Sequence, residues 1–112
     1  MFRRGEKHTT DVVEALAGHR AGRLVLVDVR EDSERARGFV PDPRHLPLGE
    51  LTQRLGELPA DRPVAFICQS GRRSAMATTS ARRAGLGAHN VEGGMNAWER
   101  NGLDMDITGR TA

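Results

Sequence analysis

Two short apolar runs constrain the fold of this chain more than any other feature of its sequence. Residues 24–27 read Leu-Val-Leu-Val and residues 64–67 read Val-Ala-Phe-Ile, and neither run contains a polar residue. A strand with one face in water alternates apolar and polar residues, whereas a strand buried on both faces is apolar throughout. The two runs therefore predict buried strands of a parallel sheet that is covered by helices.

The segments around these runs favour helices in alternation with strands. Residues 9–11 (Thr-Thr-Asp) offer oxygens that can cap a helix, and apolar residues then recur at helical spacing up to Gly18. In a later alanine-rich helix, Met76 and Ala77 are available for burial. We expect helices over residues 12–18, 31–37, 48–58, 72–84 and 95–102, and further short strands over residues 45–47 and 89–91. This order of elements argues for an open α/β sheet.

Length and composition fit one globular domain. The chain has 112 residues, of which 38% are hydrophobic and 29% charged, and no apolar stretch approaches the length of a membrane span. No apolar segment follows the basic residues at its start, so we expect a cytoplasmic location and no membrane partner. The net charge is only +2, aromatic residues make up 4%, and basic residues are interleaved with acidic ones. Nucleic-acid binders cluster their basic residues, so we expect no nucleic-acid partner.

Cysteine and histidine usage excludes several types of site. Cys68 is the only cysteine, which excludes an intramolecular disulfide, a Cys-x-x-Cys redox pair and a cysteine-rich zinc site. The four histidines are scattered and lack the spacing of a zinc-binding helix. We therefore expect neither a metal nor another cofactor.

The segment after the second apolar run carries the chemistry. A cysteine leaves a buried strand, enters a short loop that contains a glycine, and a helix follows: Cys68-Gln69-Ser70-Gly71-Arg72-Arg73-Ser74. Open α/β sheets bind ligands at the carboxyl ends of their strands. Loop amides, the helix N-terminus and nearby guanidinium groups would stabilise a Cys68 thiolate and hold an anion beside it. A buried and inert cysteine is the alternative interpretation.

Four segments of the chain, in the same order, resemble the rhodanese-like sulfurtransferase family. The loop of residues 68–74 is similar to the family's Cys-x-x-Gly-x-Arg-Ser loop. Residues 27–30 (Val-Asp-Val-Arg) resemble its Asp-x-Arg at the end of an early strand, and residues 34–47 are similar to the stretch around its Gly-His-Ile-Pro-Gly-Ala. Residues 91–98 resemble its Gly-Gly-x-x-x-Trp signature, so the resemblance covers nearly the whole chain.

The resemblance implies an α/β fold, an open parallel sheet of about five strands with helices on both faces. It places a rhodanese-like domain at residues 9–105, between an N-terminal segment of residues 1–8 and a flexible C-terminal tail of residues 106–112. Within the domain, Gly93-Gly94 is expected to form a tight turn and Trp98 to anchor the core.

The resemblance also implies a transfer of sulfane sulfur in two halves. The Cys68 thiolate would take a sulfur atom from a small anionic donor such as thiosulfate, forming a persulfide and releasing sulfite. Cyanide or a cellular thiol would then remove that sulfur. Because the chain has no second cysteine, the acceptor must come from outside.

The implied site has three groups of residues. Cys68 is the catalytic nucleophile, and the substrate is expected to be bound by Gln69, Ser70, Gly71, Arg72 and Arg73. Arg73 matches the family's loop-closing arginine, which would brace loop carbonyls or lie beside the anion, whereas Arg72 would raise the local potential. Asp28, Arg30 and Ser74 are expected to support the site, the first two through ion pairs or loop hydrogen bonds.

The chain departs from the family pattern outside the cysteine loop. Phe39 stands where the family has histidine after glycine, Asp42-Pro43 stands where it has Gly-Ala, and Asp104 replaces the usual proline. These departures leave the detail of the mid-chain loop and the substrate preference open.

Three other functions compete with a sulfurtransferase. Phosphatases and arsenate reductases of related fold need five residues between their cysteine and arginine, and only four separate Cys68 from Arg73. A rhodanese-like binding module that senses a protein partner typically lacks the cysteine. A persulfide carrier that delivers sulfur to a protein acceptor would use the same chemistry as the enzyme, so the sequence leaves this alternative open.

Overall fold

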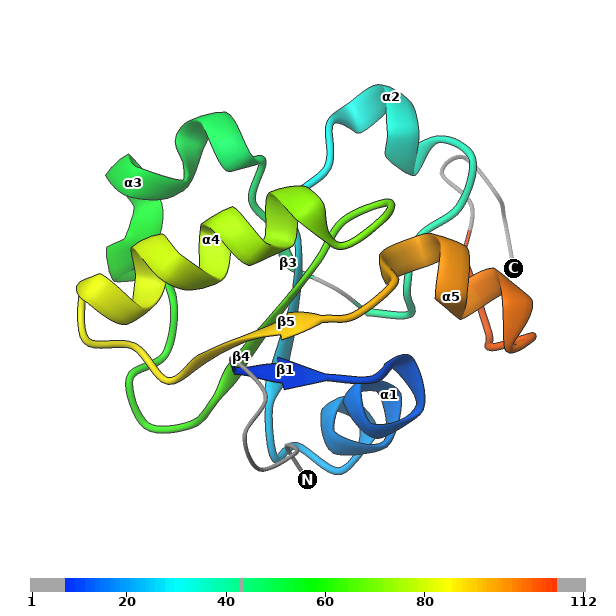
Figure 1. Ribbon diagram of the computed structural model, residues 1–112, viewed down its shortest axis with the longest axis horizontal. Coiled ribbons are helices and arrows are strands. Elements are labelled where there is room, and N and C mark those ends of the chain that lie inside the picture. Colours follow the sequence, from blue (N-terminus) through cyan, green and yellow to red (C-terminus); the bar gives the residue numbers. More distant parts are fainter. Residues whose placement is uncertain (1–7, 43, 107–112) are drawn as a thin grey trace.

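The computed structural model describes residues 8–42 and 44–106, and five strands within them form one sheet (Figure 1). The sheet order is β1-β5-β4-β2-β3, and every pairing between neighbouring strands is parallel. The predicted class of fold, an open parallel α/β sheet, is therefore confirmed. The strands are β1 (Thr9–Thr10), β2 (Val25–Asp28), β3 (Arg44–His45), β4 (Val64–Ile67) and β5 (Ala88–Val91).

In the described residues, five α-helices connect and cover these strands. They differ from the expected helices mainly in the leucine-rich segment. The single helix expected over residues 48–58 is instead three short turns, with 3-10 geometry at Leu48–Glu50 and Leu55–Glu57. Gly49 and Gly56 lie in those outer turns, and glycine costs about 1 kcal/mol relative to alanine in an α-helix. The helices are α1 (Val12–Arg20), α2 (Asp32–Arg35), α3 (Leu51–Arg54), α4 (Arg72–Arg83) and α5 (Gly94–Arg100).

The apolar core lies in two layers, one on each face of the sheet. Successive residues of a strand point to opposite faces, and accordingly Leu26 and Ile67 belong to one layer while Val27 and Phe66 belong to the other. Helices α1 and α5 complete the first layer, and α3 and α4 complete the second (Figure 1). All residues of β2 and β4 are buried, which explains why both apolar runs lack polar interruptions.

The first helix shows two differences from its predicted form. Thr9 and Thr10 form strand β1 rather than a cap, and Asp11 alone caps α1 by accepting a hydrogen bond from the Glu14 amide at 2.8 Å. The helix does not end at Gly18. A Cβ there would lie 2.7 Å from the Leu24 side chain, so this glycine permits close packing of α1 on the residue that precedes β2.

Two core predictions on the later helices have opposite outcomes. Trp98 is fully buried, and its indole nitrogen donates to the Asp104 carbonyl at 2.8 Å. Met76 was expected to be buried but is 62% exposed, because α4 turns Ala77 and Ala81 toward the sheet and leaves Met76 on its outer side.

The structure covers the predicted domain but little of the predicted segments before and after it. Residues 1–7 and 107–112 lie outside the described residues, and so do most of the predicted N-terminal segment and C-terminal tail. At the boundary, Asp106 pairs with Phe39 through two backbone hydrogen bonds of 2.8 Å. In the part of the chain that is described, no helix has both the length and the apolar character needed to cross a membrane.

Candidate active site

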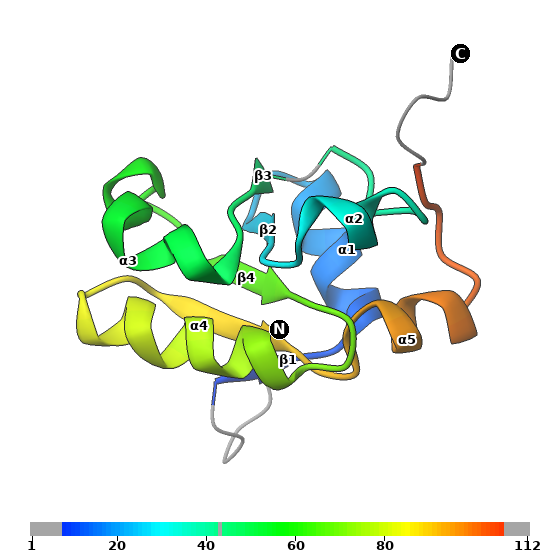
Figure 2. The same ribbon diagram turned by 90° about the horizontal axis from the view of Figure 1, so that it is seen from above.

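The candidate active site is built at the edge of the sheet where the strands end. Cys68 follows β4 directly, and after a short loop α4 begins at Arg72. Figures 1 and 2 show this loop beside the start of α5, with α2 at the same edge. Gly71 has φ 103°, a left-handed conformation that glycine adopts without strain. A Cβ at this position would also lie 3.3 Å from the Gly93 nitrogen, a tight contact, so both the backbone conformation and this close approach favour glycine.

The sulfur of Cys68 is buried and accepts hydrogen bonds from the loop and from α4. The Gly71 amide donates at 3.1 Å and the Ser74 amide at 3.4 Å, and the Ser74 hydroxyl oxygen lies 3.2 Å from Sγ. Burial raises the pKa of this thiol, but hydrogen bonds from Ser74 and from the Gly71 and Ser70 amides outweigh burial and hold the pKa below its ordinary value. The thiolate is the nucleophilic form of cysteine, so the arrangement favours a reactive sulfur.

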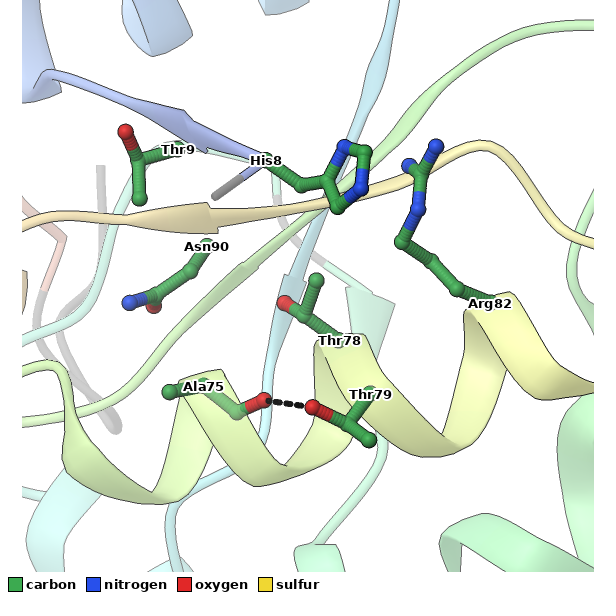
Figure 3. Close-up of a pocket in the computed structure, with 7 residues that line it drawn as sticks. All are labelled: His8, Thr9, Ala75, Thr78, Thr79, Arg82 and Asn90. Carbon is green, nitrogen blue, oxygen red and sulfur yellow. Dashed lines mark hydrogen bonds between the residues drawn. The ribbon is translucent and has the colours of Figure 1, made fainter. Parts of the chain in front are cut away.

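Asn90 on β5 is a site residue that the sequence motifs do not reveal. Its Oδ1 lies 2.5 Å from the Ser74 hydroxyl oxygen, and its Nδ2 donates to the Gly71 carbonyl at 3.1 Å. Figure 3 shows the Asn90 side chain beside β5, on the side where α4 packs. A polar residue within a predicted strand is the sequence signal that could have marked it.

Backbone amides at the start of α5 hold the cysteine loop through hydrogen bonds to its carbonyl oxygens. The Met95 amide donates to the Cys68 carbonyl at 2.8 Å, and the Asn96 amide donates to the Gln69 carbonyl at 3.0 Å. Gly94 has φ 52°, and a Cβ on it would collide with the Cys68 carbonyl oxygen and lie 2.8 Å from the Gln69 carbonyl carbon. The glycine pair therefore does more than form the predicted turn, because it lets α5 approach the loop closely.

Asp28 and Arg30 form the expected ion pair, at the end of β2. Arg30 Nη2 donates to Asp28 Oδ2 at 2.9 Å and Arg30 Nε donates to Oδ1 at 3.1 Å, and both side chains are almost fully buried. The same guanidinium group donates to the Gln69 side-chain oxygen at 3.1 Å and to the Gly38 carbonyl at 2.8 Å. The pair therefore braces the loop through Gln69 and makes no hydrogen bond to the Cys68 sulfur.

The two loop arginines occupy different environments. Arg73 donates to both carboxylate oxygens of Glu34, at 2.6 and 2.7 Å, so its guanidinium is held by α2. Of the two placements expected for it, the one on the loop carbonyls is not observed, and the one beside the substrate anion stays a prediction. The bidentate hydrogen bonds from Arg73 lower the pKa of Glu34 to about 2. Arg72, on the first turn of α4, is exposed, as is Ser70 in the loop.

Two cavities of about 480 Å³ flank the site. One is polar and lies between α2, the loop and α5, where it is lined by Ser33, Glu34, Arg37, Gln69 and Asn96. The other lies between α4 and the β1–β5 edge, and Asn90 and Thr78 are in its wall (Figure 3). Across residues 8–42 and 44–106, no group of three or more histidine, cysteine or carboxylate side chains is placed to hold a metal ion.

The residues that depart from the family pattern make their contacts elsewhere. The Arg35 guanidinium lies 4.4 Å from the centre of the Phe39 ring, and Asp104 forms an ion pair of 2.6 Å with Arg20. Asp42 has a positive φ of 50°, and Pro43 lies outside the described residues.

Comparisons with known proteins agree with this geometry. The family model of the Rhodanese-like domain matches residues 11–101. A sulfurtransferase of Allochromatium vinosum is 41% identical over 83 residues, which are 73% of this chain and 78% of that protein. The thiosulfate:glutathione sulfurtransferase of Homo sapiens is 34% identical, over 70% of this chain and 81% of its own length.

A solved structure shows the same fold. A rhodanese-related protein from Thermoplasma volcanium superposes with a TM-score of 0.83 at 27% identity, covering 89% of this chain and 98% of that one. The family match covers most of the chain, and the sequence relatives exceed 30% identity over more than two thirds of it. The chain belongs to the rhodanese-like domain family.

Proposed function

We propose that this protein is a thiosulfate sulfurtransferase that works through a persulfide on Cys68. The observation that carries the proposal is the environment of the Cys68 sulfur, which lies at a strand end and accepts hydrogen bonds from the Gly71 and Ser74 amides. Membership of the rhodanese-like family and relatives named sulfurtransferases support a role in sulfur transfer.

In the first half-reaction, the Cys68 thiolate attacks the outer sulfur of thiosulfate. A sulfur–sulfur bond forms on Cys68, the sulfur–sulfur bond of thiosulfate breaks, and sulfite leaves with the electron pair of that bond. Forming a covalent intermediate divides one difficult transfer into two easier steps. Loop amides that already point at Sγ need little reorganisation as negative charge moves onto the terminal sulfur.

In the second half-reaction, an external acceptor attacks the terminal sulfur of the persulfide. A thiolate acceptor becomes a persulfide and cyanide becomes thiocyanate, and in both cases Cys68 regains its electron pair as a thiolate. The human relative carries glutathione in its name, which supports a small thiol as the acceptor. The polar cavity beside Gln69, with the exposed guanidinium of Arg37 in its wall, offers an acceptor of this kind hydrogen-bonding groups and positive charge.

The two arginines at the start of α4 differ in whether they can attract the substrate anion. Arg73 is neutralised by Glu34, so Arg72 at the start of α4 is left as the exposed loop guanidinium that attracts an anionic donor. Gln69 and Ser70 line the approach, and Asp28, Arg30 and Ser74 keep the loop in place. A cytoplasmic location and the persulfide-carrier alternative stay as predictions.

The decisive test follows sulfur on the protein. Incubation with thiosulfate is expected to add the mass of one sulfur atom, cyanide is expected to remove it, and Cys68→Ser abolishes both the adduct and turnover. Met76→Leu, on the exposed side of α4, is the control variant and is expected to keep full activity. Sulfur transfer by the serine variant would show that the nucleophile is misassigned.

The same assay separates the competing functions. Turnover with thiosulfate and glutathione supports the enzyme, whereas an adduct that small acceptors cannot discharge supports a carrier with a protein acceptor. Hydrolysis of p-nitrophenyl phosphate by the wild-type protein would overturn the assignment, because a tetrahedral phosphate needs a wider loop than the four residues between Cys68 and Arg73 provide.

A further inference from the structure

The Ser74 hydroxyl faces two acceptors but has one hydrogen to donate. Its oxygen lies 3.2 Å from Cys68 Sγ and 2.5 Å from Asn90 Oδ1. Ser74 is fully buried, as is Cys68. The position of this hydrogen therefore depends on the two neighbours of Ser74.

The orientation of the Asn90 amide follows from hydrogen-bond chemistry. The Gly71 carbonyl is 3.1 Å from one end of the amide and can only accept a hydrogen bond, so the amide nitrogen must face Gly71. The amide oxygen then faces Ser74, and because this oxygen can only accept, Ser74 must donate to it in this arrangement.

This arrangement corresponds to an uncharged sulfur. With the Ser74 hydrogen directed at Asn90, the Cys68 thiol can donate its own hydrogen to Ser74 Oγ, which completes a chain from Cys68 to Asn90. When Cys68 loses its proton to solvent, the thiolate can only accept, so the Ser74 hydroxyl turns to it and releases Asn90 Oδ1. Ionisation of Cys68 thus replaces two hydrogen bonds, from Cys68 to Ser74 and from Ser74 to Asn90, with one from Ser74 to the thiolate.

We propose that Asn90 is a positioning residue that directs the Ser74 hydroxyl, and that it thereby favours the uncharged forms of the Cys68 sulfur over the thiolate. In a persulfide, Sγ is again uncharged, and Ser74 returns its hydrogen to Asn90. This last consequence rests on the proposed function, whereas the effect on the thiol and thiolate forms does not.

The charged groups that surround the site stay the same when Asn90 is substituted. On the α4 side Arg73 interacts electrostatically with Cys68 and is itself paired with Glu34 of α2, and the buried Asp28–Arg30 pair lies after β2. On β5, burial, then Arg82 and then His8 lower the pKa of His89 to about 4, so His89 is uncharged at neutral pH. Substituting Asn90 changes no formal charge among these groups.

The test measures the pH dependence of Cys68 alkylation by iodoacetamide in Asn90→Val. The branched side chain of valine suits strand β5, and the cavity beside Asn90 leaves room for a changed side chain. The inflection is expected to fall by about 0.5–1 pH unit, because Ser74 then donates to the thiolate without competition. Asn101→Ala, which removes an amide bonded to the Ala97 carbonyl away from the loop, is the matched control and shifts nothing.

Adding Asn90→Val to a Ser74→Ala variant tests whether Asn90 affects the Cys68 inflection by directing the Ser74 hydroxyl. In Ser74→Ala the further change Asn90→Val is expected to shift the inflection by less than about 0.2 pH unit, since the hydrogen that Asn90 directs is gone. If Asn90 only held Gly71 in place, its loss would weaken the Gly71 amide bond to sulfur and raise the inflection in both backgrounds. A rise, or no change in the wild-type background, overturns the proposal.

Two further measurements keep this result interpretable. Asn90→Leu is the second variant, with the same expected direction, and circular dichroism and thermal unfolding establish which variants are folded. Alkylation does not depend on sulfur transfer, so a protein that lacks sulfurtransferase activity but shows the Asn90 effect would refute the proposed function and leave this inference standing.

Discussion

Helices α4 and α5 start in the same way but serve the site differently. Each follows a glycine in the left-handed region, Gly71 with φ 103° and Gly93 with φ 77°, and neither has a side-chain cap. The α4 end directs the Ser74 amide at the Cys68 sulfur. The amides at the start of α5 bind the carbonyl oxygens of Cys68 and Gln69 instead.

The difference shows that the function of a helix N-terminus depends on what faces it. Unpaired amides at a helix start stabilise a negative charge, so the α4 end acts on the reactive atom. The amides of α5 are satisfied by neutral carbonyls, so α5 acts on geometry and fixes where the donors of the loop are held. Changes at α4 should therefore alter charge-dependent properties, whereas changes at α5 should displace the loop as a whole.

The largest expected effect comes from separating α5 from the loop. Gly94→Ala places a methyl group against the Cys68 carbonyl at φ 52°, so α5 or the loop must move. A displacement of about 1 Å can cost on the order of a hundredfold in rate, and we expect kcat/KM for thiosulfate to fall by about that factor.

Gly102→Ala is the control for this change. Gly102 also has a positive φ, of 64°, but no atom lies within 4 Å of the position of its Cβ. It should lose about 1 kcal/mol of stability from backbone strain and keep its activity. Equal activity losses in both variants would show that strain alone, and not contact with the loop, is responsible.

The sequence predicted the features that have a local signal and missed the pairings between distant residues. Four of the five strands in the described residues and the Cys68 loop were predicted because their signals are local: apolar runs, a cysteine at a strand end, and a glycine before a helix. Strand β1 was missed, because Thr9 and Thr10 were expected to cap a helix. Asn90 pairs with Ser74 across 16 positions and Glu34 with Arg73 across 39, and no local pattern encodes such a pairing.

Packing decided the remaining differences. An alanine-rich helix does not indicate which small residue faces the sheet, and Met76 proved to be exposed. The role of Gly94 is likewise invisible in a turn motif, because it depends on how closely α5 approaches a distant loop.

The second prediction concerns the ion pair between Arg73 of α4 and Glu34 of α2, which we call the tether. Arg73→Ala should lower kcat/KM about tenfold, less than Gly94→Ala, because one exchangeable ion pair to Glu34 is lost rather than the backbone contact of the loop. Glu34→Gln should give most of the same loss, and the double variant little more, since both residues act as one unit. Arg54→Ala breaks comparable exposed ion pairs on α3 and should leave turnover unchanged. Additive losses from Arg73 and Glu34 would contradict the tether.

The third prediction concerns the pH range in which this tether stabilises the fold. Arg73 lowers the pKa of Glu34 to about 2, below the ordinary value of 4.5 for the unfolded chain, so the contribution is complete above about pH 5 and is lost as the pH falls toward 2. Solvent screens this partly exposed pair, and we expect Glu34→Gln to be about 1 kcal/mol less stable than the wild type at pH 7. Urea unfolding at several pH values should show this difference shrinking below pH 5. A difference that is constant from pH 7 to pH 3 would contradict the assignment.

The smallest expected effect distinguishes the two ends of α4. Arg72 and Arg83 are both exposed arginines of this helix, one beside the loop and one at the opposite end. The helix has 12 residues, so its ends lie about 17 Å apart, beyond the Debye length of about 8 Å at physiological salt. Arg72→Gln should raise the KM for thiosulfate about two- to fivefold with little change in kcat, and should weaken the dependence of KM on salt. Arg83→Gln removes the same charge but should leave both quantities unchanged. If the two variants raise KM equally, the donor responds to the net charge of the protein and not to the charge at the start of α4.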